Sequence, residues 1–196
     1  LNAGHATIVI DNLSNSSRES LRRVEEITGK SVVFYEADVR DKNALDAIFT
    51  DHQIDAVIHF AGLKAVGESV AKALLYYQNN LESTLALLDT MQRFNVRKLV
   101  FSSSATVYGD PEILPIPESA PRSATNPYGQ TKLMIEQILQ DISATNESWS
   151  ITSLRYFNLV GAHPSGRIGE NPNGIPNNLM PFVSQVAIGK RDSLSI

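Results

Sequence analysis

Strand-like and helix-like segments alternate along almost the whole of this 196-residue chain. Short β-branched, apolar runs predict strands at 6–11, 32–39, 56–61, 98–102 and 151–156. Amphipathic runs between them predict helices at 18–27, 73–94, 128–142 and 180–188, and a further helix that begins after Asp41 and ends near residue 50. Strands that alternate with helices of this length predict an α/β fold with a doubly wound parallel sheet.

The interior of this fold is predicted from two apolar patterns. The strand at 56–61 has a continuous apolar run, which is typical of burial on both faces. The helix at 73–94 carries apolar residues at helical spacing, and these are Leu74, Leu81, Leu85, Leu88 and Met91. Residues 158–178 are rich in Gly, Pro and Asn and show no period, which predicts a long functional loop.

Composition excludes several functional classes. The formal net charge is −4 with no basic block, so no nucleic-acid partner is expected. The absence of cysteine excludes disulfides, thiolate zinc sites and cysteine nucleophiles. No apolar run is long enough for a membrane span, and the four scattered histidines lack metal-ligand spacing. We therefore expect no metal and no membrane partner, and the default location is the cytoplasm.

The first predicted strand ends on an acidic residue, Asp11. In nucleotide-binding sheets a carboxylate at such a strand end accepts hydrogen bonds from the adenosine ribose. It also repels a 2′-phosphate, which favours NAD over NADP. The alternative is that Asp11 only begins a turn.

The strand at 98–102 ends in hydroxyl groups, at Ser102, Ser103 and Ser104. Downstream, Tyr128 and Lys132 are four residues apart on one predicted helix and therefore share a face. A nearby ammonium would favour the phenolate and lower the pKa of Tyr128, which would make it a usable general base. The alternative for this pair is a solvated helix face.

These segments together resemble the extended short-chain dehydrogenase/reductase family, and within it the sugar-nucleotide 4-epimerases. The similarity runs along essentially the whole chain. It rests on the segments 11–16, 59–69, 76–80, 101–109, 126–132, 154–158 and 174–181. It implies a Rossmann-like NAD-binding domain at 1–157 and the start of a UDP-sugar-binding region at 158–196.

The resemblance also implies roles for individual residues. The implied catalytic residues are Tyr128, Lys132 and Ser104. The implied NAD-binding residues are Asp11, Asn12, Asn15, Ser16, Asp38, Val39, Phe60, Ala61, Gly62, Lys64, Asn79, Ser102, Tyr128, Lys132 and Phe157. The implied substrate-binding residues are Ser104, Tyr128, Asn158, Asn178 and Leu179.

The implied reaction is NAD-dependent epimerisation at C4 of UDP-glucose and UDP-galactose through a transient 4-keto sugar. The implied assembly is a homodimer through the helices at 73–94 and 128–142. For some residues a plain structural role stays open: Asn79 on the surface, His59 in the core, and Asn177 and Asn178 as helix caps.

Other functions remain alternatives. A nucleotide-sugar 4,6-dehydratase of this family carries an Asp-Glu pair after the strand, whereas Ala105 and Thr106 follow Ser104 here. A related epimerase for uronic or N-acetylated sugars is harder to separate. An inactive fragment or a non-catalytic module is the alternative from another class.

The sequence departs from the family pattern at both ends. Gly4 is typical of the residue that ends a helix, and no glycine-rich phosphate loop is present; the segment at 62–67 is not a phosphate-binding loop. We expect that the first strand lies before residue 1 and that more of the UDP-binding region follows Ile196. We also expect that these residues alone would neither complete the sheet nor hold NAD.

Overall fold

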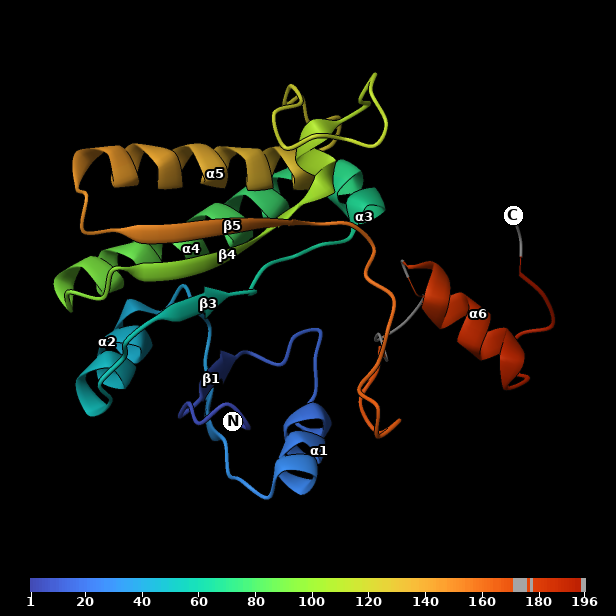
Figure 1. The fold of residues 1–196 in the computed structure, drawn as a ribbon, viewed down its shortest axis with the longest axis horizontal. Helices are drawn as coiled ribbons and strands as arrows, with labels where there is room; N and C mark the ends of the chain where they lie inside the picture. The colour runs from blue at the N-terminus through green and yellow to red at the C-terminus, as the bar shows by residue number, and fades with distance from the viewer. Residues whose placement is uncertain (171–175, 177, 195–196) are drawn as a thin grey trace. The chain divides into compact units, whose positions relative to one another are not determined.

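The computed structural model describes residues 1–170, 176 and 178–194 of the chain. It has the predicted α/β class, and all the paired strands are parallel (Figure 1). The chain forms two compact units. Unit 1 comprises Leu1–Ala37 and Asn158–Ile196, and unit 2 comprises Asp38–Phe157.

Unit 1 contains a two-stranded sheet and two helices. Its elements are β1 (Ile8–Asp11), α1 (Glu19–Thr28), β2 (Val33–Glu36) and α6 (Leu179–Ala187). β1 pairs with β2 so that Ile8 lies beside Val33 and Asp11 beside Glu36. α1 ends at Gly29, whose φ of 66° is the left-handed geometry expected of a helix stop.

Unit 2 contains a three-stranded sheet in the order β3-β4-β5. Its elements are α2 (Lys42–Asp51), β3 (Val57–His59), α3 (Val66–Ala71), α4 (Ala73–Arg93), β4 (Lys98–Ser104), the 3-10 helix η1 (Ala105–Tyr108), α5 (Pro127–Thr145) and β5 (Ser150–Tyr156). α4 packs against α5, and α5 also contacts β4 and β5. The core of the unit lies between these elements and includes Tyr76, Met91, Leu99, Phe101, Ile135 and Leu139.

Local sequence explains where the main helices begin. Asp41 caps α2, because its Oδ1 accepts hydrogen bonds from the backbone N–H groups of Asn43 and Ala44 at 3.0 and 3.3 Å. Asn126 caps α5 by accepting from the N–H of Gly129 at 2.8 Å, and Pro127 occupies the first turn. The predicted cap of α2 is confirmed.

Two elements of unit 2 are absent from the sequence-based prediction. α3 has six residues and η1 has four, so neither is long enough to show a helical period. Near the start of unit 1, Gly4 has a φ of 90° and its N–H bonds to the carbonyl of Leu1 at 3.0 Å. In the described residues this segment is a turn.

The burial of two elements differs from the prediction. Ile58 in β3 is 62 % exposed, because the helices of unit 2 cover the opposite face of its sheet. α4 buries a stripe that includes Tyr76, Asn80, Thr84, Leu87 and Met91, and leaves Leu74 and Leu85 exposed. The predicted apolar stripe of this helix was therefore partly wrong, because several positions on its buried face carry polar residues.

Candidate active site

β4 places a serine hydroxyl at the carboxyl end of the unit 2 sheet. Ser104 is the last residue of β4 and is buried. Its Oγ accepts a hydrogen bond from the hydroxyl of Thr106 at 3.0 Å and one from the N–H of Thr106 at 3.3 Å. Ser104 therefore begins η1 as its N-cap, which holds the serine side chain at the strand end.

The first two turns of α5 carry Tyr128 and Lys132. Between them, Gly129 allows the helix to approach η1 closely: a Cβ at this position would lie 3.0 Å from the carbonyl oxygen of Thr106. The phenol of Tyr128 lies near enough to Ser104 for that hydroxyl to act on its pKa. The structure thus brings the three predicted catalytic residues, Ser104, Tyr128 and Lys132, into one cluster.

Lys132 is buried, with only 5 % of its surface exposed. Its Nζ donates a hydrogen bond to the carbonyl oxygen of Ser102 at 2.7 Å. It lies 4.8 Å from the ring centroid of Phe101 and 5.9 Å from that of Tyr128. Burial lowers the pKa of Lys132 to about 8, because a desolvated ammonium is costly.

The pKa of Tyr128 is raised above its ordinary value by burial, and a hydrogen bond with Ser104 opposes this only in part. The predicted lowering of the pKa of Tyr128 by Lys132 was therefore wrong for this arrangement. The ammonium is directed at the carbonyl of Ser102, and desolvation of the phenol dominates.

Asn80 positions the loop that follows β3, and sequence reasoning missed it. Its Oδ1 accepts a hydrogen bond from the N–H of Leu63 at 2.8 Å, and its Nδ2 donates to the carbonyl of Leu63 at 3.0 Å and to Thr131 Oγ1 at 3.1 Å. A Cβ on Gly62 would lie 3.2 Å from Asn80 Oδ1. Asn79, the residue singled out from the sequence, donates to Asn80 Oδ1 at 3.1 Å.

His59 is a core residue, which was one of the alternatives considered for it. It is buried, and its Nε2 lies 3.0 Å from Thr84 Oγ1. Burial and the charge of Lys132 lower the pKa of His59 to about 4. It is therefore a neutral core residue at physiological pH.

The other predicted cofactor residues of unit 2 lie near the ends of its strands or in adjoining loops. Phe60 and Phe157 follow β3 and β5 and are 64 % and 63 % exposed, which is unusual for phenylalanine. Ala61 and Lys64 are exposed in the loop after β3. Val39 is buried in the core.

Asp38 lies at the start of unit 2 and bonds to a neighbouring arginine. Its carboxylate accepts hydrogen bonds from the N–H, Nε and Nη2 of Arg40 at 2.9, 2.9 and 2.8 Å. These contacts raise the pKa of Arg40 and hold the Asp38 carboxylate in place.

In unit 1 the turn after β1 is organised by Asp11. Its Oδ1 accepts hydrogen bonds from the N–H of Leu13 and from Ser16 Oγ, both at 2.7 Å. Oδ2 of Asp11 has no hydrogen-bond partner among the residues that the structure describes. Asn12 Oδ1 accepts from the N–H of Ser14 at 3.1 Å, and Asn15 is exposed.

The predicted substrate residues outside unit 2 are all in unit 1. Asn158 and Leu179 are exposed. Asn178 precedes α6 but does not cap it with its side chain, since its Nδ2 donates to Glu170 Oε1 at 2.6 Å. Asn177 lies outside the described residues.

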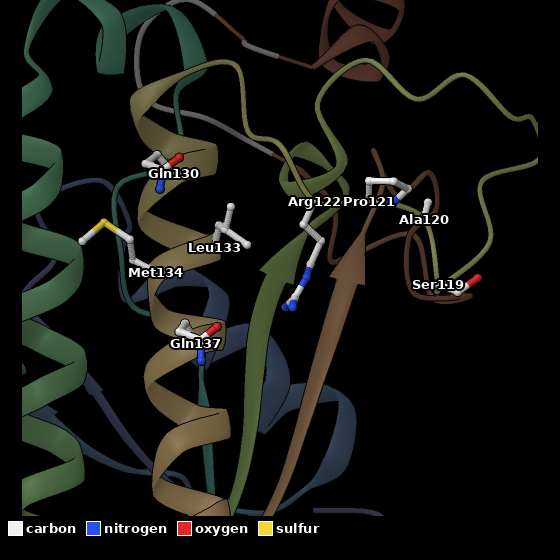
Figure 2. A pocket seen from close by; sticks show the side chains of 8 residues that line it. All are labelled: Ser119, Ala120, Pro121, Arg122, Gln130, Leu133, Met134 and Gln137. Atoms are coloured by element: carbon white, nitrogen blue, oxygen red, sulfur yellow. The ribbon is translucent and has the colours of Figure 1, made fainter.

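A pocket on unit 2 lies between α5 and the loop before it (Figure 2). Its volume is about 640 Å³, and it is lined by Ser119, Ala120, Pro121, Arg122, Gln130, Leu133, Met134 and Gln137. None of the predicted catalytic residues lines it.

Over the described part of the chain, no group of His, Asp and Glu side chains is arranged to hold a metal ion. Nor does that part contain a helix both long and apolar enough to span a membrane.

Comparison with known proteins gives consistent matches. The NAD dependent epimerase/dehydratase family matches residues 1–196. A UDP-glucose 4-epimerase of Bacillus subtilis is 63 % identical over 196 residues, which are 100 % of this chain and 58 % of that protein.

Two solved structures also resemble the chain closely. A UDP-glucose 4-epimerase from Bifidobacterium longum, in complex with NAD+ and UDP, superimposes with a TM-score of 0.94 at 57 % identity over 97 % of this chain and 57 % of that one. One from Stenotrophomonas maltophila, with bound NAD and formylated UDP-arabinopyranose, has a TM-score of 0.95 at 48 % identity over 98 % of this chain and 57 % of that one. The chain thus spans less than three fifths of the length of these relatives.

Proposed function

The chain belongs to the NAD dependent epimerase/dehydratase family, and from this premise we propose that the protein carrying it interconverts UDP-glucose and UDP-galactose at C4 with NAD as cofactor. One observation in unit 2 supports the chemistry most directly. A serine hydroxyl, a tyrosine phenol and a buried ammonium come together at the end of β4, from Ser104, Tyr128 and Lys132. The named relatives support the substrate class.

In the proposed reaction the chain's own residues move one proton. Tyr128 removes the proton of the sugar 4-hydroxyl and later returns it, while Ser104 hydrogen-bonds the same oxygen. NAD, when bound, would accept the hydride from C4 and return it to the opposite face. The O–H and C4–H bonds break as the carbonyl forms, and both are restored, so the sugar undergoes no net oxidation.

For Tyr128 to act as a base, its surroundings must stabilise the deprotonated phenol. Because burial raises the pKa of this phenol, it stays protonated at neutral pH without a further positive charge. The charge of Lys132, 5.9 Å from the ring, is already present in this structure, and desolvation of the phenol still dominates. We assign Lys132 the role of stabilising the phenolate once Tyr128 has lost its proton and of binding the ribose next to the nicotinamide.

Each unit, taken by itself, offers groups that suit a part of a dinucleotide. Asp11 keeps one carboxylate oxygen without a partner among the described residues, which suits the hydroxyls of an adenosine ribose. The exposed rings of Phe60 and Phe157 suit contact with the cofactor. We assign the remaining cofactor contacts to Asn12, Asn15, Ser16, Asp38, Val39, Ala61, Gly62, Lys64, Asn79 and Ser102.

We assign the UDP-sugar contacts to Ser104, Tyr128, Asn158, Asn178 and Leu179. We further propose a homodimer formed through α4 and α5. These helices pack against each other, and they expose Leu85 and Met134. The functional division proposed for the whole protein is an NAD-binding part at 1–157 and a UDP-sugar-binding part that begins at 158.

The experiment is an assay of UDP-galactose to UDP-glucose conversion by the protein that carries this chain, beside Tyr128→Phe. Loss of the acid/base group should lower kcat by about 10²- to 10⁴-fold. The control is Tyr77→Phe on α4, which should leave the rate unchanged.

A parent protein that converts no UDP-galactose, or a Tyr128→Phe variant with full activity, would contradict the proposal. Loss of water from the sugar would indicate a 4,6-dehydratase instead. That outcome is disfavoured because Ala105 and Thr106 stand where dehydratases of this family carry acids, and the Thr106 hydroxyl is bonded to Ser104.

A further inference from the structure

A buried carboxylate, that of Glu136, lies on α5 one helical turn beyond Lys132. Its side chain is 2 % exposed, and an isolated charge at such a position would be strongly unfavourable. The proposed reaction gives it no role. Its contacts therefore call for an explanation.

Three side chains donate hydrogen bonds to this carboxylate. Ser103 Oγ donates to Oε1 at 2.6 Å. Arg155 donates from Nε to Oε1 at 2.9 Å and from Nη2 to Oε2 at 2.8 Å, and Arg122 Nη1 donates to Oε2 at 3.1 Å. Burial alone would raise the pKa of Glu136, but these hydrogen bonds outweigh it, so its pKa lies below the ordinary value and the group is ionised.

The partners of Glu136 flank the candidate catalytic cluster. Ser103 stands between Ser102, whose carbonyl holds Lys132, and Ser104. Arg155 on β5 is the register partner of Ser103 on β4, so both side chains project from the same face of the sheet. One carboxylate therefore joins the end of β4, the neighbouring strand and the helix that carries Tyr128 and Lys132.

The network also includes η1 and the loop before α5. Arg155 Nη1 donates to the hydroxyl of Tyr108 at 2.7 Å and to the carbonyl of Glu118 at 3.2 Å. Figure 2 shows Arg122 extending from its loop alongside the end of β4, and its Nη1 reaches Glu136 on α5. The segment that follows Ser104 is thus held at both of its ends, at Ser104 itself and at Tyr108.

We propose that Glu136 is a positioning residue for the candidate catalytic cluster. By joining Ser103 and Arg155 to α5, it sets the distance between the hydroxyl end of β4 and the phenol and ammonium of Tyr128 and Lys132. This inference rests on the proposed function. It adds that the cluster depends on a carboxylate that touches none of its three members.

The test compares Glu136→Gln and Ser103→Ala in the protein that carries this chain. A misplacement of about 1 Å can cost about a hundredfold in rate, so we expect Glu136→Gln to lower kcat by about that factor. The KM for UDP-galactose should change little. Ser103→Ala removes one hydroxyl and no charge, and should lower kcat in the same direction by a smaller factor. Glu82→Gln, an exposed carboxylate on α4, is the control and should leave kcat unchanged.

A second readout does not depend on turnover. The ultraviolet titration of the protein minus that of its Tyr128→Phe variant isolates ionisation of the Tyr128 phenol. Removing the negative charge of Glu136 would by itself lower the pKa of Tyr128, since two arginines would be left less compensated. Moving Lys132 away from the phenol would raise it. We expect a rise in both Glu136→Gln and Ser103→Ala.

The outcomes separate the two proposals. Suppose that the parent is active. The positioning role is then overturned if the two variants keep the parent's kcat, or if the pKa of Tyr128 falls or stays constant in them, and the proposed function is left intact. A parent without epimerase activity overturns the proposed function, and the titration then decides the positioning role alone. Variants that fail to fold in circular dichroism would assign Glu136 to stability and would also overturn the positioning role.

Discussion

At the scale of single residues, burial favours the neutral form of both ionisable side chains in the candidate cluster. It raises the pKa of Tyr128 and lowers that of Lys132 to about 8. The phenolate of Tyr128 and the ammonium of Lys132 are both charged, so burial makes each of them less favourable than the neutral form. Burying these two groups in their charged forms therefore lowers the stability of the folded chain, and this cost can be measured.

Replacing Lys132 by methionine should remove this cost. The pKa of Lys132 is about 8 in the folded chain and 10.5 ordinarily, so below pH 8 the folded state bears a charge that it disfavours. The penalty, on the order of 3 kcal/mol, shrinks as the pH rises from 8 to 10.5 and is absent above that. We expect Lys132→Met to be the more stable protein at pH 7, by an amount that shrinks toward pH 10.

Urea unfolding at several pH values measures this difference, and the assay for UDP-galactose should show the variant inactive. A Lys132→Met protein that is less stable than the parent at pH 7, or equally so at every pH, would contradict the prediction.

The carboxylate of Asp11 provides a test of cofactor choice. Asp11→Asn keeps an acceptor oxygen for the N–H of Leu13 but loses the charge that would repel a 2′-phosphate. We expect the preference for NAD over NADP to fall by about tenfold, or about 1.4 kcal/mol. Calorimetric titration with each dinucleotide measures the ratio of affinities. Asp51→Asn, at the exposed end of α2, should not alter it.

At the scale of elements, the loop between η1 and α5 is held by close backbone contacts. Gly109 ends η1 with a φ of 59°, and its N–H bonds to the carbonyl of Thr106. A Cβ at this position would lie 2.0 Å from the carbonyl oxygen of Ser123. The backbone at Gly109 and the backbone at Ser123 are therefore packed directly against each other, close to the turn that follows Ser104.

Gly109→Ala should therefore destabilise the protein by about 2 kcal/mol or more, through backbone strain and a clash together. Gly166→Ala is the matched control: its φ is 68°, but a Cβ there would meet nothing within 4 Å. The control should cost only about 1 kcal/mol, the penalty for the left-handed conformation. Thermal unfolding of both variants tests this, and equal losses would show that the contact with Ser123 carries no energy.

At the scale of the whole molecule, α4 and α5 expose apolar side chains that unit 2 leaves uncovered. Leu85 is 49 % exposed on α4, and Met134 is partly exposed on α5. The proposed homodimer would cover both. Full burial of an exposed large apolar side chain contributes about 1.5–3 kcal/mol, and these two half-exposed side chains would each contribute about half of that.

The variant Leu85→Glu combined with Met134→Glu should therefore shift the protein from dimer to monomer. Light scattering after size-exclusion chromatography measures the mass of each species. Leu114→Glu, at a loop leucine that is 76 % exposed, is the control and should remain dimeric. A parent that is monomeric at micromolar concentration, or a double variant that stays dimeric, would contradict the proposed interface.

Local patterns were enough to predict the α/β class, the parallel strands and most of the helices. The cap at Asp41 and the stop at Gly29 act within a few residues of themselves, so their effects can be read from neighbouring letters. The helical spacing of Tyr128 and Lys132 is local as well, and both residues lie on α5 as that spacing predicted.

Burial and long-range pairing could not be read in this way. Asn80 lies on the buried face of α4 because α5 and the loop after β3 contact it. Since Asn80 is polar, a search for apolar residues at helical spacing did not identify that face as buried. The carboxylate of Glu136 is stabilised by side chains from β4, β5 and a loop. A charged residue within β5, Arg155, was the available signal for that network.

The pKa shift of Tyr128 also separates what local sequence determines from what the tertiary structure determines. Its position four residues before Lys132 follows from the spacing of a single helix and was evident in the order of the residues. Whether the ammonium or desolvation controls the phenol depends on where Ser102, Ser104 and the helices lie in space. Helical spacing is a property of consecutive residues, whereas the electrostatic environment of a side chain is produced by segments that are distant in the chain and adjacent only after folding.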